Sequence, residues 1–189
     1  MRKLVVTQNI TMDGSIEMLG DWFNPQGQEG ADQSDLMEEL HRQDADADAF
    51  LVGRKTFEDL RGYWRDLPDD ATGVSNYLNR VHKYVVSSTM TEPDWEPTTM
   101  LSGDPVEEVR ALKQADGKDI VVTGSITLTH ALIEAALVDE YRLFVYPSVQ
   151  GRGRRLFPDG FELERLDLLE TRGFNAGIAM LRYAPRRAA

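Results

Sequence analysis

Five short apolar runs constrain the fold of this chain more than any other feature of its sequence. Each run has three or four residues, most of them β-branched or aromatic, and lies close to polar, glycine or proline residues. The runs occupy residues 4–6, 49–52, 84–86, 120–122 and 143–145. Continuous apolar strands of this kind usually lie in a sheet that is covered on both faces. We therefore predict five strands of a buried sheet.

Helical patterns lie between these predicted strands. They cover residues 34–43, 106–115 and 128–137, where leucine, isoleucine, valine and methionine recur at helical spacing. Ser34 is predicted to be the N-cap of the first helix, and Asp104 precedes a proline at the start of the second. Because strands and helices alternate as far as about residue 146, we predict an α/β domain with a largely parallel sheet.

The C-terminal part of the chain has a different pattern. Leucines recur through residues 161–171, residues 178–183 alternate, and the Asn-Ala-Gly segment at 175–177 favours a turn. We predict a terminal antiparallel β-hairpin here. The acidic residues 44–48 are expected to form a solvated helix end. Because no linker, repeat or low-complexity tract interrupts the sequence, we predict one domain over residues 1–189.

Charge and composition exclude several classes of function. The chain of 189 residues has a formal net charge of −11, which disfavours nonspecific binding to nucleic acid or anionic membranes because phosphates would be repelled. It has no cysteine, so disulfides and thiolate chemistry are excluded. Its three histidines lack the spacing of a metal site. No apolar run is long enough for a membrane span or a signal-peptide core, so we expect a cytoplasmic protein without a bound metal.

The strand at residues 49–52 runs into a segment with the chemistry of an anion site. Gly53 ends the strand, and a helix is expected to start at Thr56 or shortly after it. The first turn of a helix offers free backbone N–H groups and the positive end of the helix dipole, and Arg54 and Lys55 would add positive charge there. The alternative is an ordinary strand-to-helix turn in which Thr56 caps the helix and both cations lie on the surface.

Two other strand ends have similar chemistry. Gly124 and Ser125 follow the fourth predicted strand, where glycine permits close approach of a ligand and serine is a good helix cap. Ser87 and Ser88 follow the third predicted strand, and alone they indicate only a turn. Ligands of open α/β sheets bind outside the carboxyl ends of the strands, so three such ends in one sheet favour a common phosphate-binding site.

The glycine-rich fingerprints of the Rossmann and Walker type do not occur in the sequence. Residues 151–155, Gly-Arg-Gly-Arg-Arg, resemble a phosphate loop in composition. They precede Leu-Phe-Pro at 156–158 rather than a helix, so we interpret them as a structural turn with exposed cations.

Taken in order, these motifs resemble the dihydrofolate-reductase-like family, which includes the C-terminal reductase domain of the riboflavin-biosynthesis deaminase/reductase. The resemblance covers nearly the whole chain. It rests on residues 11–14 (Thr-Met-Asp-Gly), 52–58 (Val-Gly-Arg-Lys-Thr-Phe-Glu), 85–88 (Val-Val-Ser-Ser), 122–125 (Val-Thr-Gly-Ser), 137–143 (Leu-Val-Asp-Glu-Tyr-Arg-Leu), Pro147, 151–153 (Gly-Arg-Gly) and 156–157 (Leu-Phe). Each motif is weak alone, whereas their order and spacing together are specific.

The resemblance implies a mixed, mostly parallel sheet flanked by helices, NADPH as the hydride donor, and a homodimer. It places Arg54, Lys55 and Thr56 near the 2′-phosphate of the adenosine, with Ser87 and Ser88 at the same end of the cofactor. The remaining cofactor-binding residues that it predicts are Thr7, Gly53, Thr123, Gly124, Ser125 and Ile126, the last three along the pyrophosphate. The Gly-Arg-Gly segment is expected to be architectural.

This sequence departs from the family pattern at three points. Thr123 stands where the family often has the first of two glycines, which leaves Gly124 to provide the close approach to the pyrophosphate. The first long loop has Trp22 and Phe23 but no Pro-Trp pair, unlike that of true dihydrofolate reductases. No deaminase with zinc ligands accompanies the reductase-like part, so the chain resembles a stand-alone member.

The candidates for catalysis and substrate binding lie in and after the first loop. Folate reductases resemble one another in using a carboxylic acid on the helix after this loop, and Asp35 is the nearest candidate for a proton donor here. The preference of helix starts for acids explains Asp35 equally well. We predict that Asp13, Trp22 and Phe23 contact the substrate. Alternatively, Asp13 shapes its own turn and the two aromatic residues, if exposed, form a dimer contact.

The predicted function is NADPH-dependent hydride transfer to a small heterocyclic or carbonyl substrate. The nearest named activities are 5-amino-6-(5-phosphoribosylamino)uracil reductase, of riboflavin biosynthesis, and dihydrofolate reductase. The alternative is a non-catalytic nucleotide-binding or dimeric scaffold protein that retains the fold.

Overall fold

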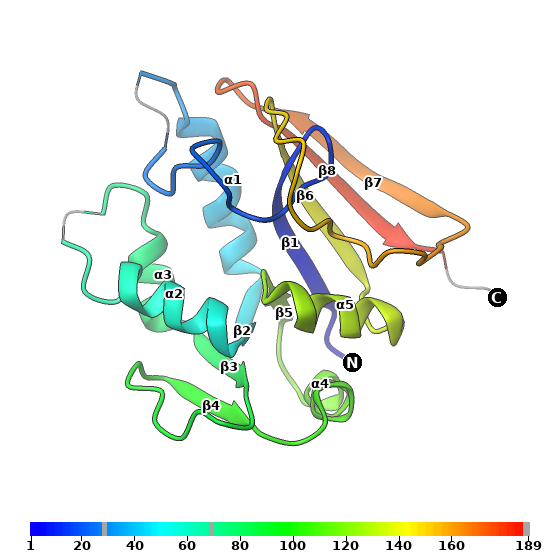
Figure 1. The fold of residues 1–189 in the computed structure, drawn as a ribbon. Coiled ribbons are helices and arrows are strands. Elements are labelled where there is room, and N and C mark those ends of the chain that lie inside the picture. The colour runs from blue at the N-terminus through cyan, green and yellow to red at the C-terminus, as the bar shows by residue number, and fades with distance from the viewer. Residues whose placement is uncertain (28–29, 69, 187–189) are drawn as a thin grey trace.

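The structure, a computed structural model, describes residues 1–27, 30–68 and 70–186. Within these ranges the chain forms one eight-stranded sheet and five helices (Figure 1). The strands are β1 (Leu4–Thr11), β2 (Ala47–Gly53), β3 (His82–Val86), β4 (Thr98–Leu101), β5 (Asp119–Val122), β6 (Glu140–Tyr146), β7 (Leu166–Gly173) and β8 (Ala179–Pro185). The helices are α1 (Ser34–Ala45), α2 (Arg54–Trp64), α3 (Val74–Arg80), α4 (Pro105–Gln114) and α5 (Ile126–Glu134).

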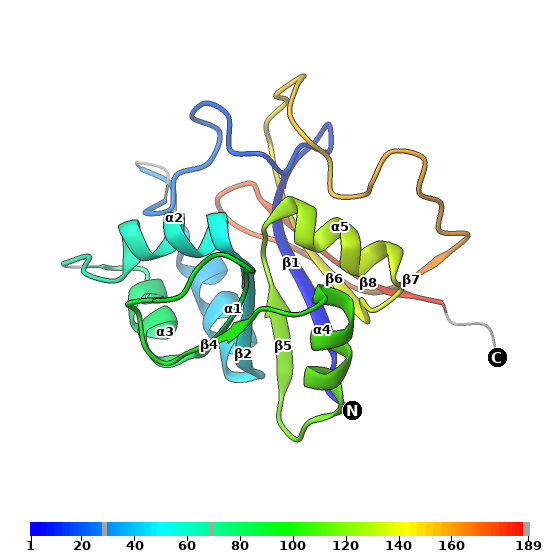
Figure 2. The same cartoon turned by 60° about the horizontal axis from the view of Figure 1, so that its bottom comes forward.

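The strand order of the sheet is β4-β3-β2-β5-β1-β6-β8-β7. All neighbours from β4 to β6 are parallel, so their carboxyl ends lie at one edge of the sheet. Strand β8 is antiparallel to β6, and β7 is antiparallel to β8. The long loops that follow β1 and β6 both extend beyond this carboxyl edge (Figure 2).

The helices cover both faces of the sheet. On one face, alternate strand residues such as Leu4, Leu51 and Val122 pack against apolar side chains of α4 and α5. On the other face, Phe50 and Val52 pack against α2 and α3, and a third apolar cluster joins α1 to β6 and β8. Because side chains on both faces of these strands are buried, both faces have to be apolar, which explains the continuous apolar runs in the sequence.

The predicted α/β class, the mostly parallel sheet and the terminal antiparallel hairpin are confirmed. All five predicted strands are present, although β1 continues to Thr11 because its later residues remain paired with β6. Helix α3 and strand β4 have no counterpart in the sequence prediction. Helix α3 has seven residues and β4, at the edge of the sheet, has four, so neither is long enough to give a clear periodic pattern.

Two helix starts differ from the prediction. Helix α1 begins at Ser34 with Gln33 in the cap position, because Asp32 accepts hydrogen bonds from the N–H and the hydroxyl of Ser34 at 3.0 and 2.7 Å. Helix α2 begins at Arg54, before Thr56, because Gly53 is already the extended cap residue at which the chain enters the helix.

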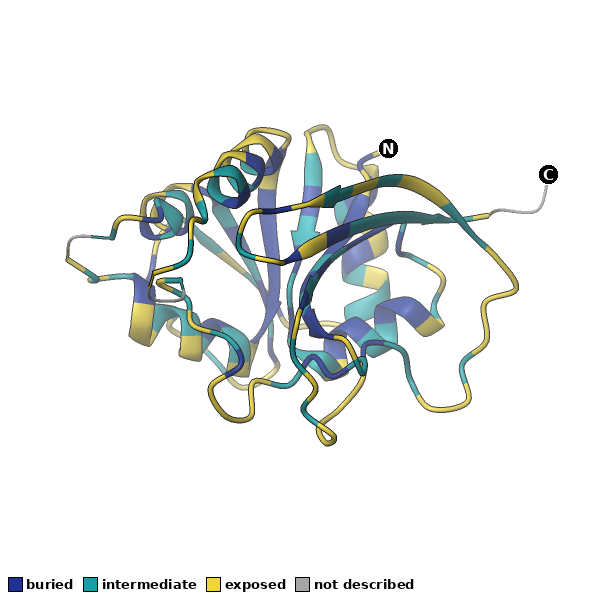
Figure 3. Ribbon diagram, turned by 90° about the horizontal axis from the view of Figure 1, so that it is seen from above, coloured by how far each residue is buried: buried dark blue, intermediate teal, exposed yellow. Residues whose placement is uncertain are grey.

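Two segment boundaries are also corrected. The hairpin begins at Leu166, later than the predicted residue 161, and its outer strand β7 consists of exposed and half-buried residues (Figure 3). The acidic segment does not belong to one helix end, because Asp48 lies in β2 and forms an ion pair with Arg2.

The part of the chain that the structure describes contains neither a membrane-spanning helix nor a cluster of metal ligands. No helix there is long and apolar enough to cross a membrane. No group of three or more histidine, aspartate or glutamate side chains there is arranged to hold a metal ion.

Candidate functional site

The β2–α2 and β5–α5 junctions interlock at the carboxyl edge of the sheet. The N–H of Gly53 donates to the carbonyl oxygen of Gly124 at 3.1 Å. A Cβ on Gly124 would lie 2.7 Å from Oγ1 of Thr56, and a Cβ on Gly53 would collide with the hydroxyl of Ser125. The two glycines therefore permit an approach that any side chain would prevent. In this way the structure brings together the residues that the sequence predicted to bind phosphate after β2 and after β5.

Both helices present backbone N–H groups at this junction. No side chain caps α2, and its first turn contains no acidic residue. The hydroxyl of Ser125 caps α5 by accepting a hydrogen bond from the N–H of Leu128 at 3.4 Å, and Ile126 is the first helical residue. The N–H groups of a first helical turn have no partner within the helix, and they lie at the positive end of its dipole. The junction, with Thr123 just before it, is a favourable place for an anion.

Arg54 and Lys55 supply positive charge at the start of α2. Arg54 forms an ion pair with Glu58 at 3.1 Å, and Lys55 forms one with Asp59 at 3.0 Å. The two cationic side chains are 50% and 76% exposed, and exposed pairs of this kind contribute only about 0–1 kcal/mol to stability. Either cation can therefore exchange its carboxylate for a phosphate with little loss of stability.

The end of β3, which Ser87 and Ser88 follow, lies beside the junction of β2 and α2. Gly53 is in register with the last residue of β3, so Ser87 follows next to the start of α2. The Ser87 hydroxyl accepts hydrogen bonds from the N–H groups of Thr89 and Met90 at 3.2 and 3.0 Å and thereby stabilises its own turn. Ser88 is exposed. Of the two predicted serines, Ser88 is the one whose side chain faces solvent at this edge.

Polar residues occupy the centre of the sheet on the face that carries α1. Thr7 and Asn9 are half-buried, although β1 is a central strand and Val5 and Thr11 on the same face are buried. Asn9 is in register with Phe144, which packs in the apolar cluster of α1. The sequence prediction included Thr7 and missed Asn9. Two polar residues at a spacing of two within a strand are the signal that identifies this position.

Asp13 joins the loop after β1 to the loop after β6. Its carboxylate accepts hydrogen bonds from the hydroxyl of Thr11 at 2.6 Å and from the N–H groups of Gln150 and Gly151 at 3.1 and 2.7 Å. These hydrogen bonds, that of Thr11 above all, lower the pKa of Asp13 to about 2. Both carboxylate oxygens are thus used to shape the loops. A contact between Asp13 and substrate stays a prediction.

Trp22 is buried, so the condition of the alternative interpretation, two exposed aromatic residues that form a dimer contact, is not met. Its indole packs edge-on against Tyr146 with the ring centroids 5.5 Å apart, and Phe23 packs against both rings. The loop folds back because these rings bury their apolar surface against the cluster of α1, β6 and β8, which leaves only Phe23 partly accessible. Substrate contacts by the two residues stay predictions.

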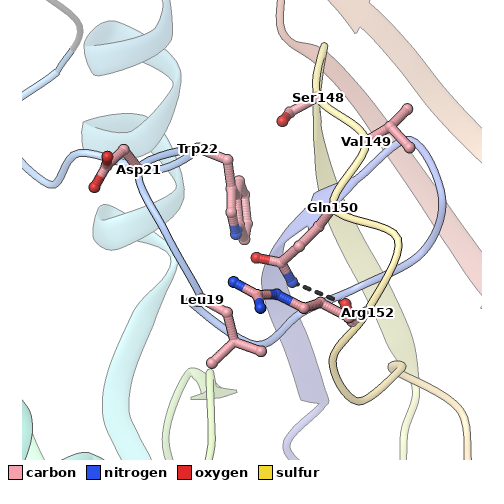
Figure 4. A pocket seen from close by; sticks show the side chains of 7 residues that line it. All are labelled: Leu19, Asp21, Trp22, Ser148, Val149, Gln150 and Arg152. Atoms are coloured by element: carbon pink, nitrogen blue, oxygen red, sulfur yellow. Dashed lines mark hydrogen bonds between the residues drawn. The ribbon is translucent and has the colours of Figure 1, made fainter.

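A pocket of about 650 Å³ lies beside Trp22 (Figure 4). It is lined by Leu19, Asp21, Trp22, Ser148, Val149, Gln150 and Arg152. Gln150 donates to the carbonyl oxygen of Arg152 at 2.9 Å, whereas its Oε1 is buried without a partner among the described residues. Figure 4 shows the guanidinium of Arg152 extending toward Trp22 and Leu19. By contrast, Arg154 pairs with Glu17 at 2.6 Å, as expected for an architectural turn.

Asp35 connects α1 to the terminal hairpin. One carboxylate oxygen accepts a hydrogen bond from the N–H of Leu36, and the other accepts one from the N–H of Asn175 in the β7–β8 turn, both at 2.9 Å. These contacts lie on the β8–β7 side of the sheet, away from the Gly53–Gly124 junction on β2 and β5. The role of Asp35 as a proton donor stays a prediction.

Comparisons with known proteins agree with this fold. The sequence model of the family described as RibD C-terminal domain matches residues 2–180. The relative named "uncharacterized protein YyaP", of Bacillus subtilis (strain 168), is 32% identical over 188 residues, which cover 96% of this chain and 94% of that protein. A solved structure of a putative riboflavin biosynthesis protein from Shewanella sp. PV-4 has a TM-score of 0.68 at 20% identity, covering 98% of this chain and 99% of that one. A pyrimidine reductase-like protein from Corynebacterium diphtheriae has a TM-score of 0.67 at 18% identity, covering 99% and 93%.

Proposed function

Because the chain belongs to the family of the RibD C-terminal domain, we propose that it is a reductase that uses NADPH as the hydride donor for a small heterocyclic or carbonyl substrate. The observation that carries the proposal is the interlocked pair of junctions at residues 53–56 and 123–126, beside two cations at the start of α2. Two proteins of similar fold, the putative riboflavin biosynthesis protein and the pyrimidine reductase-like protein, support the same class of activity.

The residues at the junctions fit the phosphates of a dinucleotide. The N–H groups at the starts of α2 and α5 are suitable donors for phosphate oxygens, and the planar guanidinium of Arg54 can bind a phosphate through two parallel hydrogen bonds. We assign the 2′-phosphate to Arg54 and Lys55, because these cations stand at the start of α2. We assign the pyrophosphate to the start of α5, where Gly124 permits the closest approach.

The proposed pyrophosphate site lies beside the central strand β1 of the sheet. Gly124 follows the end of β5, and the neighbouring strand β1 carries Thr7 and Asn9. The half-buried side chains of these two residues can hydrogen-bond to a ring on the face of α1. NADPH would supply the hydride chemistry when it is bound. The protein's own contribution would be to hold the ring, to orient the substrate against it and to exclude water.

We assign the substrate to the pocket beside Trp22. The indole is fixed by its contact with Tyr146 and gives a planar ring a rigid surface on which to pack. Gln150, Ser148 and Arg152 add hydrogen-bonding groups around that surface. Leu19, Trp22 and Val149 give the pocket an apolar part, and its other four lining residues are polar or charged, so it can both pack against a ring and fix the orientation of that ring.

Arg54→Ala tests the assignment of the cofactor. The dissociation constant of NADPH should rise by roughly 10- to 100-fold, because a charge-assisted pair with the 2′-phosphate contributes about 1.5–3 kcal/mol. NADH lacks that phosphate, so its affinity should change less than about twofold. Fluorescence titration of both cofactors measures these values. Arg110→Ala is the matched control, since Arg110 is also half-exposed and pairs with a glutamate, Glu107, on helix α4, which belongs to neither junction.

Equal losses for NADPH and NADH would contradict the placement of the 2′-phosphate. A wild-type protein that binds neither cofactor below millimolar concentration would contradict the proposed function as a whole. The homodimer and the cytoplasmic location also stay proposals. Sedimentation of the purified protein at micromolar concentration tests the homodimer, and a monomer would refute it.

A nucleotide-binding protein without catalysis is the second candidate, and the position of Asp35 favours it. Both oxygens of that carboxylate accept backbone hydrogen bonds, so the acid predicted to donate a proton already has a structural role. NADPH oxidation over a panel of pterin, folate, flavin-precursor and quinone substrates separates the two candidates. Cofactor binding without turnover of any member would favour the second.

A further inference from the structure

A second pocket, of about 400 Å³, lies at the amino edge of the sheet, opposite the junctions of α2 and α5. It is lined by Lys3, Ala45, Asp46, Lys118, Asp119, Arg142 and Arg182. Four of these seven residues are cations, in a chain that has 32 acidic and only 21 basic residues. Two of the seven, Asp46 and Asp119, are acids, so the lining has a formal charge of +2 in a chain whose net charge is −11.

Two arginines form the floor of this amino-edge pocket. Arg142 on β6 and Arg182 on β8 stand directly opposite each other in the strand register. Two like charges in that arrangement repel each other unless an anion lies between them. The buried carboxylate of Glu140 occupies that place and accepts hydrogen bonds from Nε of Arg142 at 2.7 Å and from Nε of Arg182 at 2.9 Å.

The guanidinium of Arg142 retains an unused donor. The side chain is 3% exposed, its Nε binds Glu140, and its Nη2 lies 3.3 Å from a carboxylate oxygen of Asp119. Its Nη1 is buried and has no hydrogen-bond partner among the residues that the structure describes. A buried guanidinium N–H without a partner is rare in proteins, because its desolvation is not compensated.

The other charged groups leave one lysine largely uncommitted. Lys3 is 61% exposed and approaches Glu140 only to 3.8 Å. Lys118 donates to the carbonyl oxygen of Ala45 at the end of α1, which offsets the negative end of that helix dipole. The carboxylates of the pocket also have cationic partners, Asp119 in Arg142 and Asp46 in Arg42 at 3.9 Å. Lys3, which among the described residues is held only by this long contact with Glu140, is therefore the cation of the pocket that can most easily turn to an anion.

From the unpaired Nη1 of Arg142 and the exposed ammonium of Lys3, we infer that the amino-edge pocket binds a small phosphate monoester, separately from the carboxyl-edge cofactor site. Arg182 adds positive charge nearby, although its guanidinium is held by Glu140 and, at 2.6 Å, by Glu170. A guanidinium and an ammonium on one side of a pocket match the oxygens of a phosphate. A volume of about 400 Å³ has room for a small organic group beyond the phosphate itself, which favours an ester such as a sugar phosphate over the free ion.

Isothermal titration calorimetry with glucose 6-phosphate, at constant ionic strength, tests the inference. We expect a dissociation constant at or below about 1 mM for the wild-type protein and no measurable binding of glucose. Lys3→Gln should weaken binding at least about fivefold, and this exposed residue can be replaced without disturbing the fold. Arg110→Gln, which removes an equivalent exposed charge elsewhere, should leave the affinity unchanged.

Three outcomes would overturn the inference. The first is that the wild-type protein does not bind glucose 6-phosphate, and the second is that it binds glucose equally well. The third is that Lys55→Gln, and not Lys3→Gln, weakens the binding of glucose 6-phosphate, which would put the anion at the carboxyl edge. Inorganic phosphate serves as a further probe. Weaker binding of inorganic phosphate than of glucose 6-phosphate supports an ester as the ligand, and equal binding supports the anion site but refutes the preference for an ester.

Discussion

Replacing Gly124 with alanine is expected to abolish useful binding of NADPH, with a loss of affinity of about 100-fold or more. The new Cβ would lie 2.7 Å from Oγ1 of Thr56, and Gly124 has a φ of +156°, which side chains rarely adopt. Overpacking and backbone strain each cost about 1–3 kcal/mol. Here the overpacking acts on Thr56 in the first turn of α2, and the strain acts at Gly124 itself, just before α5. Fluorescence titration with NADPH measures the affinity, and thermal unfolding measures the accompanying loss of stability.

Gly62→Ala is the matched control for this substitution. Gly62 lies within α2, and a Cβ there has no neighbouring atom within 4 Å. Alanine should stabilise the helix by about 0.5–1 kcal/mol and leave the affinity for NADPH unchanged. If Gly124→Ala bound NADPH as tightly as the wild type, the interlocked junctions could not be the place where the cofactor phosphates bind.

The largest effect on stability is expected from Glu140→Gln, with a loss of about 3–5 kcal/mol in the free energy of unfolding. The side chain of Glu140 is 1% exposed and carries the negative charge between Arg142 and Arg182. The substitution would leave these two cations facing each other across β6 and β8 without compensation. Urea denaturation at neutral pH measures the difference.

The pH dependence of stability follows from the same cluster. Burial alone would raise the pKa of Glu140. The hydrogen bonds and charges of Arg142 and Arg182 lower it by more than burial raises it, so that the pKa in the folded protein lies below 4.5. The contribution of the ion cluster to the free energy of unfolding is therefore fully present above that pH and is lost as the pH falls below it.

Glu107→Gln is the matched control for Glu140→Gln. Because Glu107 forms an exposed pair with Arg110, its replacement should cost no more than about 1 kcal/mol, and an equally small effect of Glu140→Gln would refute the assignment.

The sequence predicted the parts of the fold that depend on local patterns. Apolar runs such as that at residues 49–52 identify buried strands because both of their faces are covered in the sheet. The Asn-Ala-Gly segment at residues 175–177 identifies the hairpin turn because glycine there has a positive φ. Helix α3 and strand β4 are held by tertiary contacts rather than by a periodic pattern of their own, so they could not be predicted in this way.

The sequence predicted individual residues of the candidate site from their own chemistry, but not the contacts between them. Gly53 and Gly124 stand out in the sequence because each ends an apolar strand, yet their mutual approach depends on β2 and β5 being neighbours in the sheet. The sequence predicts Asp13 as a substrate contact and Asp35 as a proton donor, but it does not show that their carboxylates accept hydrogen bonds from Gly151 and Asn175. Such long-range partners are properties of the fold, which local sequence patterns do not contain.

Hydrogen–deuterium exchange in the presence and absence of NADPH tests the central claim most directly. If the cofactor phosphates bind at the carboxyl edge, NADPH should slow the exchange of backbone amides in residues 53–56 and 123–126, where α2 and α5 begin. Exchange in β7, the edge strand on the far side of the sheet from β2 and β5, should not change. Protection confined to other segments, or none at saturating NADPH, would contradict the account.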